Sequence, residues 1–195
     1  MAKVKIPKII IEVSARHVHL AQANLDVLFG KNYQLTKLRK LSQRDEFAAN
    51  EAVDLKTAKN ILRHVRILGP DRDYTQIEMS KTDAFYLGLA PLVKDSGDLQ
   101  DTPGITIVGP KGEIDAQQGV ILSHRHIHCS PAEAQKYNLN NDQLVKVKAM
   151  GKRGLVFDQV LIKIRDGYIW RMHLDTDEAN AAGIDDSNNQ GEVIM

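Results

Sequence analysis

The sequence predicts a mainly β fold with two related halves, a barrel or a sandwich. Short β-branched runs recur along the chain, and turns that contain Gly or Pro separate them. Few stretches have the length and spacing of a long helix. One pattern, Ser-x-Arg-His-(Val/Ile)-His, occurs at residues 14–19 and again at 123–128. The repeat predicts that each half carries the same strand-and-histidine unit.

The first half contains short elements. The β-branched run at 8–13 predicts a strand that ends at the first histidine pair. A helix is expected over 21–29, where apolar residues have helical spacing and Gly30 follows. Three short strands are expected next: 53–55, 65–68 and 75–79. A short helix should follow them over 82–87.

The second half follows a loop that ends near Gly104. Strands are expected at 105–108, 119–122, 144–147, 155–164 and 168–174, with a hairpin turn at 109–112. The run Ser130-Pro131-Ala132-Glu133 predicts a helix start with a capping residue, a proline and a glutamate in their preferred places. Asp175 should cap another short helix that ends near Gly183. Residues 185–195 are expected to be a polar tail, since 185–190 show no periodicity.

Composition excludes several functional classes. The 195 residues carry 26 Lys and Arg against 25 Asp and Glu, and aromatic residues make up only 5%. Without a net basic field or many stacking platforms, no nucleic-acid partner is expected. No apolar run approaches the roughly 20 residues of a membrane span, so no membrane partner is expected. The single Cys129 allows no intrachain disulfide, and a cytoplasmic protein is expected.

The two histidine pairs predict metal binding. Residues i and i+2 of a strand point to the same side, so His17 and His19 can reach one ion, and so can His126 and His128. A catalytic zinc usually has three protein ligands and one open position. Glu78 and His173 are candidates for the third ligands, because each is polar on a strand of alternating apolar residues. The alternative for each is an ordinary solvent-facing side chain.

Other chemically capable residues are less distinctive. Basic residues gather near these points: Arg16, Arg66, Arg72, Arg125 and the cluster at 37–40. Arginine suits bidentate phosphate contacts, although the cluster at 37–40 could equally be a solvated face. Cys129 could be a nucleophile or a ligand, but a lone Cys is more often a small buried hydrophobe. No phosphate-binding loop or nucleophile elbow is present.

Longer motifs resemble a known family. They are residues 14–20, 66–70, 75–78, 95–99, 104–106, 108–112, 125–128, 154–158 and 172–180. Together they resemble the PduL-type phosphate propanoyltransferases, over about residues 8–184. Cys129 departs from the pattern, because the family has Met there, and this argues against an acyl-cysteine intermediate. The N-terminal extension that targets some members to a microcompartment also looks absent.

The resemblance implies two β-barrels capped by short helices, with a metal site between them. Residues 6–15 and 124–184 would form one barrel, and 16–123 the other. The resemblance also implies two zinc ions, one held by His17, His19 and Glu78 and the other by His126, His128 and His173. Arg72 would bind phosphate. The implied coenzyme A contacts are Ser14, Ala15, Arg16, Arg39, Lys40, Arg66, Leu68 and Asn180.

The implied activity is reversible transfer of a propanoyl or acetyl group between coenzyme A and phosphate. The implied partners are coenzyme A, acyl-CoA and phosphate, and a homo-oligomer is possible. Two alternatives stay open on the residues alone. A two-zinc site could activate water in a hydrolase, or a zinc-stabilised module could bind coenzyme A without catalysis. Histidine and carboxylate ligands also suit iron or cobalt.

Overall fold

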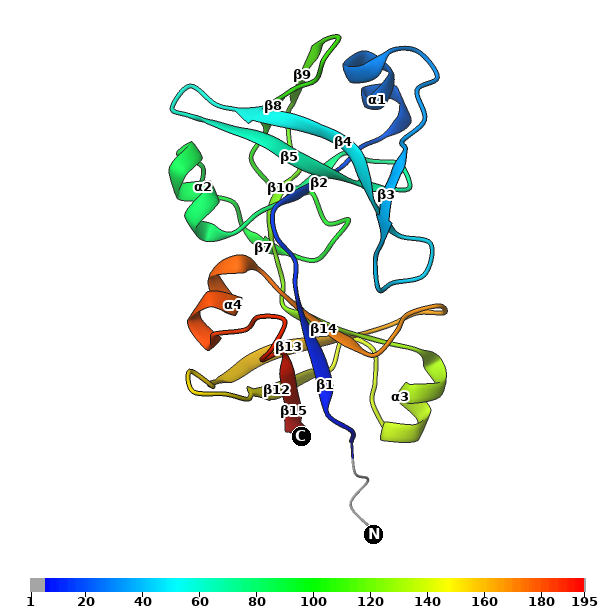
Figure 1. Ribbon diagram of the computed structural model, residues 1–195, viewed down its shortest axis with the longest axis vertical. Helices are drawn as coiled ribbons and strands as arrows, with labels where there is room; N and C mark the ends of the chain where they lie inside the picture. The colour runs from blue at the N-terminus through cyan, green and yellow to red at the C-terminus, as the bar shows by residue number, and fades with distance from the viewer. Residues whose placement is uncertain (1–5, 195) are drawn as a thin grey trace. The chain divides into compact units, whose positions relative to one another are not determined.

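The computed structural model describes residues 6–194, and the chain divides into two compact units. Unit 1 combines the N-terminal segment up to Ser14 with the segment from His124 onward, and unit 2 is Ala15–Ser123. Both units are built mainly from strands, with four short helices among the described residues (Figure 1). The predicted mainly β fold class is therefore confirmed.

Unit 1 is a closed six-stranded barrel. Its strand order is β1-β14-β11-β13-β12-β15. The strands are β1 (Ile9–Val13), β11 (His126–Cys129), β12 (Leu144–Ala149), β13 (Val156–Ile164), β14 (Arg171–Leu174) and β15 (Gln190–Ile194). Helices α3 (Pro131–Tyr137) and α4 (Thr176–Ala182) lie on opposite sides of this barrel in Figure 1.

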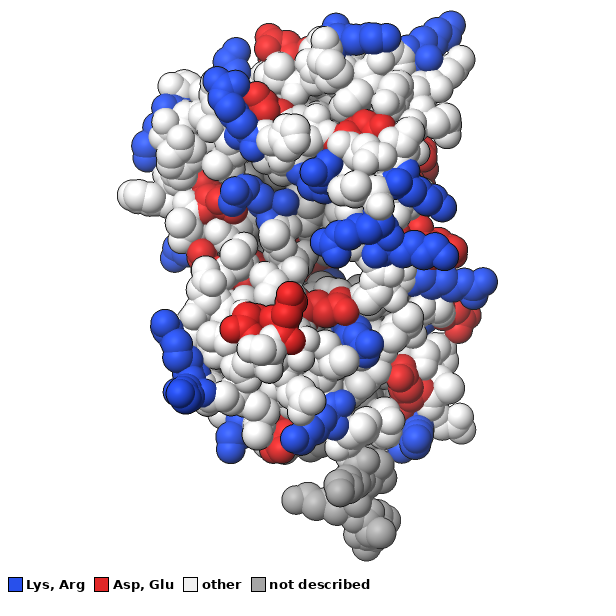
Figure 2. Space-filling view, viewed as in Figure 1, with Lys and Arg blue, Asp and Glu red and all other residues white. Residues whose placement is uncertain are grey.

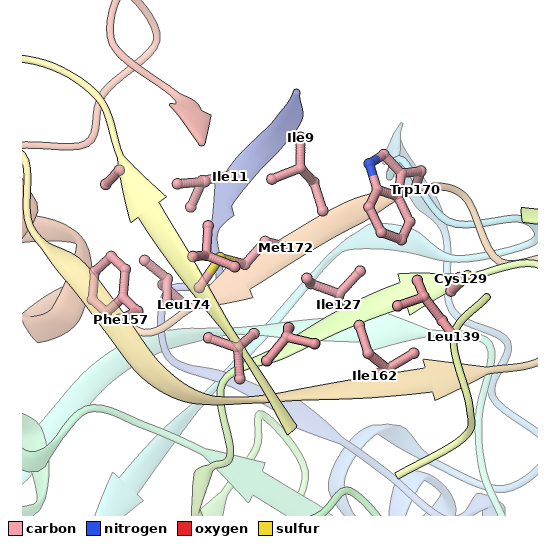
Figure 3. Close-up of a cluster of buried hydrophobic side chains, with 14 of the residues drawn as sticks. Ile9, Ile11, Ile127, Cys129, Leu139, Phe157, Ile162, Trp170, Met172 and Leu174 are labelled. Atoms are coloured by element: carbon pink, nitrogen blue, oxygen red, sulfur yellow. The ribbon is translucent and has the colours of Figure 1, made fainter. Parts of the chain in front are cut away.

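Strand alternation separates the barrel core from the histidines. Ile127 and Cys129 on β11 are fully buried, as is Met172 on β14, and Figure 3 shows their side chains among those of the barrel interior. Because neighbouring residues of a strand face opposite ways, His126 and His128 must point away from this core. The apolar core thus fixes the direction in which the second histidine pair faces.

The end of the chain corrects one expectation. Residues 185–195 were expected to form a polar tail, but Gln190–Ile194 form β15, which pairs antiparallel with both β1 and β12. This strand closes the barrel. The sequence of β15 lacks the alternating apolar pattern of a buried strand, because Gly191 is its one buried residue and the other positions are partly or fully exposed. A Cβ added at Gly191 would meet a Val147 methyl group at 2.9 Å, so the strand packs closely without an apolar side chain there.

Unit 2 is a nine-stranded sheet that is curled but not closed. Its path is β7-β10-β6-β2-β5-β4-β8-β9, with β3 paired to β4. The strands are β2 (His17–His19), β3 (Lys37–Lys40), β4 (Phe47–Lys56), β5 (Ile61–Gly69), β6 (Gln76–Glu78), β7 (Val93–Lys94), β8 (Ile105–Val108), β9 (Glu113–Ala116) and β10 (Val120–Ser123). The helices are α1 (Gln22–Phe29) and α2 (Lys81–Leu87).

Several predicted local features are present. The turn at 109–112 joins β8 and β9 in a hairpin, and α1 ends before Gly30. Ser130 and Glu133 form a reciprocal capping box at the start of α3, as the sequence predicts. Strand β4 is longer than predicted, because its buried face includes the polar Glu51, which accepts hydrogen bonds from Tyr33 and Thr36. No helix among residues 6–194 has the length and apolar character needed to cross a membrane.

Candidate metal centre

The first candidate ligand triad lies on two adjacent strands of unit 2. β2 pairs antiparallel with β6, and His17 stands directly opposite Glu78. The alternation of β2 places His19 beside His17. One ligand atom from each of the three residues lies within 4.8 Å of the other two. The structure therefore brings together three residues that are up to 61 positions apart in the sequence.

Hydrogen bonding and burial prepare both histidines as ligands. The Nδ1 atom of His17 lies 2.9 Å from the carbonyl oxygen of Ala15, so Nδ1 carries the proton and donates it. This leaves the Nε2 lone pair free, 3.7 Å from the Glu78 Oε2 atom. Burial lowers the pKa of His19 well below its ordinary value, and the neighbouring His17 and Arg72 lower it further. His19 is therefore neutral at pH 7.

The donor set of this triad fits a divalent metal ion. The Nδ1 atom of His19 is buried and has no hydrogen-bond partner, which is costly unless something binds the ring. Two neutral imidazoles and one carboxylate are usual ligands of zinc and of several other transition metals. A bridge through an ion would satisfy the three side chains together.

The second candidate triad repeats this arrangement in unit 1. β11 pairs antiparallel with β14, and His126 stands directly opposite His173. The ring centroids of His126, His128 and His173 lie 4.6 to 5.2 Å apart. The Nε2 atoms of His126 and His128 are 3.1 Å apart. Three imidazoles thus cluster on the outer face of the barrel.

The second triad has the same tautomer control as the first. The Nδ1 atom of His126 lies 2.8 Å from the carbonyl oxygen of His124 and donates to it. Burial is the main cause that lowers the pKa of His126 well below its ordinary value. Burial also lowers the pKa of His128 to about 3, with smaller effects from His173, Lys163 and Arg165. Neutral rings offer lone pairs that a divalent metal ion could use. Among the described residues, however, only His17, His19 and Glu78 have ligand atoms that all lie within 4.8 Å of one another.

Arg72 lies next to the first triad. Its backbone N–H donates to the carbonyl oxygen of Leu20, one residue after His19. Its guanidinium donates to the Ser96 hydroxyl at 3.1 Å and the Tyr74 hydroxyl at 3.3 Å, and it lies 3.6 Å from a Glu46 carboxylate oxygen. The side chain is only 25% exposed. A partly buried, well-supported guanidinium is suited to binding an oxyanion.

Gln76 is a supporting residue that the sequence alone did not reveal. Its side chain is fully buried, and its Nε2 donates to Glu78 Oε1 at 2.6 Å and to Ser96 Oγ at 3.0 Å. Its Oε1 accepts the Gly97 N–H at 2.7 Å. Gln76 therefore links a triad carboxylate to the hydroxyl that supports Arg72. Strand alternation placed Gln76 on the side of Glu78, but the approach of Ser96 depends on the folded loop.

The residues expected to contact coenzyme A lie on several different elements. Arg66 and Leu68 lie on one face of β5, and Arg66 pairs in register with His17. The Arg66 guanidinium donates to the backbone carbonyl oxygens of Ala49 and Asn50. Arg39 and Lys40 are exposed on β3, and Figure 2 shows basic side chains gathered over the part of unit 2 where Figure 1 places β3.

Three of the remaining expected contacts lie in the segment between β1 and β2, and the fourth lies on α4. Ser14 follows β1, and its N–H donates to the carbonyl oxygen of Leu174. Ala15 and Arg16 lead into β2 and are exposed, although the Arg16 guanidinium binds Asp83 at 2.8 Å. Asn180 is exposed on α4.

Cys129 is a core residue of the barrel. It is fully buried, and burial raises the pKa of its thiol to about 11. A buried, protonated thiol is a poor nucleophile. The interpretation of Cys129 as a small buried hydrophobe is confirmed.

Comparison with known proteins agrees with these features. Residues 10–185 match the profile of the family described as phosphate propanoyltransferase. The chain belongs to this family. A phosphate propanoyltransferase of Thermotoga maritima is 47% identical over 191 residues, which cover 97% of this chain and 89% of that protein. One of Clostridioides difficile is 44% identical over 173 residues, or 89% of this chain and 83% of that protein.

A relative from a third organism is similar to the chain over most of its length. The phosphate propanoyltransferase of Rhodopseudomonas palustris is 44% identical over 174 residues, which cover 89% of this chain and 77% of that protein. The matched region of the family, residues 10–185, includes both histidine triads and Arg72. The family membership expected from the motifs is therefore confirmed.

Proposed function

We propose that this protein reversibly transfers a short acyl group, propanoyl or acetyl, between coenzyme A and inorganic phosphate. The observation that carries the proposal is the 47% identity to a phosphate propanoyltransferase over nearly the whole chain. The histidine triads and the supported arginine give that activity a chemical basis. In the reaction, an oxygen of phosphate bonds to the acyl carbon, the carbon–sulfur bond breaks, and the coenzyme A thiolate leaves.

The proposal includes two zinc ions. His17, His19 and Glu78 would hold one, and His126, His128 and His173 would hold the other. When bound, zinc supplies Lewis acidity that favours the developing negative charge on the thioester oxygen and the leaving sulfur. The depressed pKa values of His19, His126 and His128 support this assignment, because a protonated imidazole cannot be a ligand.

Arg72 is proposed to bind and orient phosphate. Its hydrogen bonds to Ser96 and Tyr74 hold the guanidinium in place before substrate arrives, which reduces the entropy lost on binding. Direct attack by bound phosphate requires no protein nucleophile. The burial of Cys129 supports this route.

Coenzyme A is proposed to bind through the residues that the family resemblance implies. The proposed contacts are Ser14, Ala15, Arg16, Arg39, Lys40, Arg66, Leu68 and Asn180. The exposed basic side chains of β3 suit the nucleotide phosphates of coenzyme A.

A thiol-release assay tests the proposed activity. Free thiol is followed from propanoyl-CoA and acetyl-CoA, with and without phosphate, before and after chelation and return of zinc. Phosphate-dependent release that zinc restores, with acyl phosphate formed, is the expected result. Release without phosphate would instead indicate a thioesterase. No release under any condition would indicate a binding module.

Two variants test the assigned roles. Arg72→Ala should retain zinc and raise the phosphate KM steeply, whereas Arg63→Ala, a change at an exposed arginine paired with Asp54, should not. An unchanged phosphate KM in Arg72→Ala would refute its role. His126→Ala should lower both zinc content and rate, and full zinc occupancy in this variant would refute the ligand assignment.

A further inference from the structure

The two candidate triads share one local arrangement, although they lie in different units. In each, the first histidine of a His-x-His strand is paired in register with the third ligand on an antiparallel strand. The pairs are His17 with Glu78 and His126 with His173. Directly opposed residues have Cβ atoms roughly 5 Å apart. The strand pairing alone therefore brings these side chains within reach of a common ligand.

The helix that follows the third ligand begins in the same way in both units. A capping residue stands two positions beyond the ligand, Ser80 in unit 2 and Asp175 in unit 1, and a seven-residue helix follows. Each cap side chain accepts the backbone N–H of the third helical residue, which is Asp83 in α2 and Glu178 in α4. That third residue is acidic in both units, five positions after the ligand.

Each of these acids binds the arginine of the repeated motif. The Arg16 Nη1 atom lies 2.8 Å from Asp83 Oδ1, and the Arg125 Nε atom lies 2.7 Å from Glu178 Oε1. The two carboxylates are largely buried, with side chains 11% and 19% exposed. The other Asp83 oxygen is buried without a hydrogen-bond partner. The guanidinium of Arg16 thus balances the negative charge of the Asp83 carboxylate.

The place of the arginine in the chain connects the ion pair to the histidine. Arg16 lies between Ala15, whose carbonyl oxygen accepts the His17 Nδ1–H, and His17 itself. Arg125 lies between His124 and His126, which are joined by the corresponding hydrogen bond. An arginine held at this point fixes the backbone that presents the carbonyl oxygen. That carbonyl in turn fixes the tautomer and the direction of the first ligand ring.

We propose that Arg16 and Arg125 are equivalent positioning residues. Each binds the acid at the third position of the following helix and so holds the His-x-His strand against the strand that carries the third ligand. The Nδ1–H tautomer of His17 depends on Arg16, and that of His126 depends on Arg125. This inference deepens the proposed function and rests on its two metal triads.

The first test reads the histidine rings without metal or activity. Long-range ¹⁵N–¹H NMR spectra of the full-length, zinc-free chain report the tautomer of each imidazole. In the wild type, His17 and His126 should each show a single Nδ1–H tautomer. Arg16→Gln should convert His17 to a mixture of tautomers and leave His126 unchanged, and Arg125→Gln should do the reverse.

The second test measures zinc affinity by competition with a chromophoric chelator. Each glutamine variant should weaken one of two sites about 10- to 100-fold and leave the other at its wild-type affinity. Arg16→Lys and Arg125→Lys should recover part of the loss, because lysine keeps the charge but not the shape of the guanidinium. Arg63→Gln is the matched control, since Arg63 also pairs with an acid, Asp54, but is 74% exposed.

The outcomes separate this inference from the proposed function. Wild-type protein that binds no zinc would refute the metal assignment, and the NMR result would still decide the positioning role. Unchanged His17 and His126 spectra in both glutamine variants would overturn the positioning role, whether or not zinc binds. Equal changes at both histidines in either variant would also overturn it, because general loosening of the fold would then explain them.

Discussion

Replacing Gln76 with methionine tests whether the buried amide supports the first triad. Gln76→Met keeps an unbranched side chain of similar size but removes all three of its hydrogen bonds. The loss falls unequally on the three partners. Ser96 and Gly97 are exposed, so water can replace the amide there, whereas the Glu78 side chain is 12% exposed and loses a 2.6 Å bond.

The expected cost follows from these differences. A hydrogen bond to a charged group contributes about 1.5–3 kcal/mol, and each of the two others contributes about 0.5 kcal/mol when water can replace it. The sum predicts that Gln76→Met lowers the free energy of unfolding by about 2.5–4 kcal/mol. The phosphate KM should also rise several-fold, because Ser96 joins Gln76 to Arg72.

Urea unfolding followed by far-ultraviolet circular dichroism measures the stability. The only tryptophan, Trp170, lies in unit 1, so its fluorescence does not report directly on the surroundings of Gln76 in unit 2. Hydrogen exchange of peptides covering 76–97 supplies the local measurement. Gln117→Met is the control, because the exposed Gln117 donates one bond to Asp115. A loss below about 0.5 kcal/mol, equal to that of the control, together with an unchanged phosphate KM, would refute the reasoning.

Three further predictions concern pH, the thiol and the last strand. The pKa of His128 is about 3 in the folded chain, below its ordinary value, so only the unfolded chain gains a proton near pH 6.5. The metal-free protein should therefore lose stability as the pH falls from 6.5 towards 3, and His128 should account for about 2 kcal/mol of this loss at pH 5. In His128→Gln, the urea midpoint of unfolding should depend less strongly on pH. At pH 8, alkylation of Cys129 should be at least about a hundredfold slower than in denatured chain, and Cys129→Ala should keep its activity; fast alkylation would contradict its burial. A chain ending at residue 189 should lack the cooperative unfolding transition of the barrel in Trp170 fluorescence, because β15 closes the barrel. A transition like that of the wild type would contradict this.

Local sequence rules were sufficient where a feature depends on near neighbours. Two histidines separated by one residue must share a face of a strand, and the structure places His17 with His19 and His126 with His128 in this way. The capping box of Ser130 and Glu133 also depends on only four residues. Such features could be predicted because their geometry is set within one element.

Features that depend on distant pairing could not be derived from local patterns. The opposition of His17 and Glu78 is fixed by the register of β2 against β6. Strand β15 gave no clear alternating apolar signal, because one of its two inward positions is Gly191 and the other, Val193, is only partly buried. For the same reason strand alternation could offer Glu78 and His173 only as candidates, and the resemblance to a known family, which carries information about tertiary structure, was needed to assign each to a histidine pair.

The repeated motif also shows which parts of the two halves are constrained and which vary. The arginine, the two histidines, the strand register and the acid after the helix cap are all kept in both units. The candidate third ligand changes from Glu78 to His173, and this would change the charge of the ligand set. Two neutral imidazoles and a carboxylate carry one negative charge, whereas three neutral imidazoles carry none. The same divalent ion would therefore keep more positive charge in unit 1 than in unit 2. The shared arrangement thus keeps the geometry alike in both units, while Glu78 and His173 make the charges of the two candidate ligand sets differ.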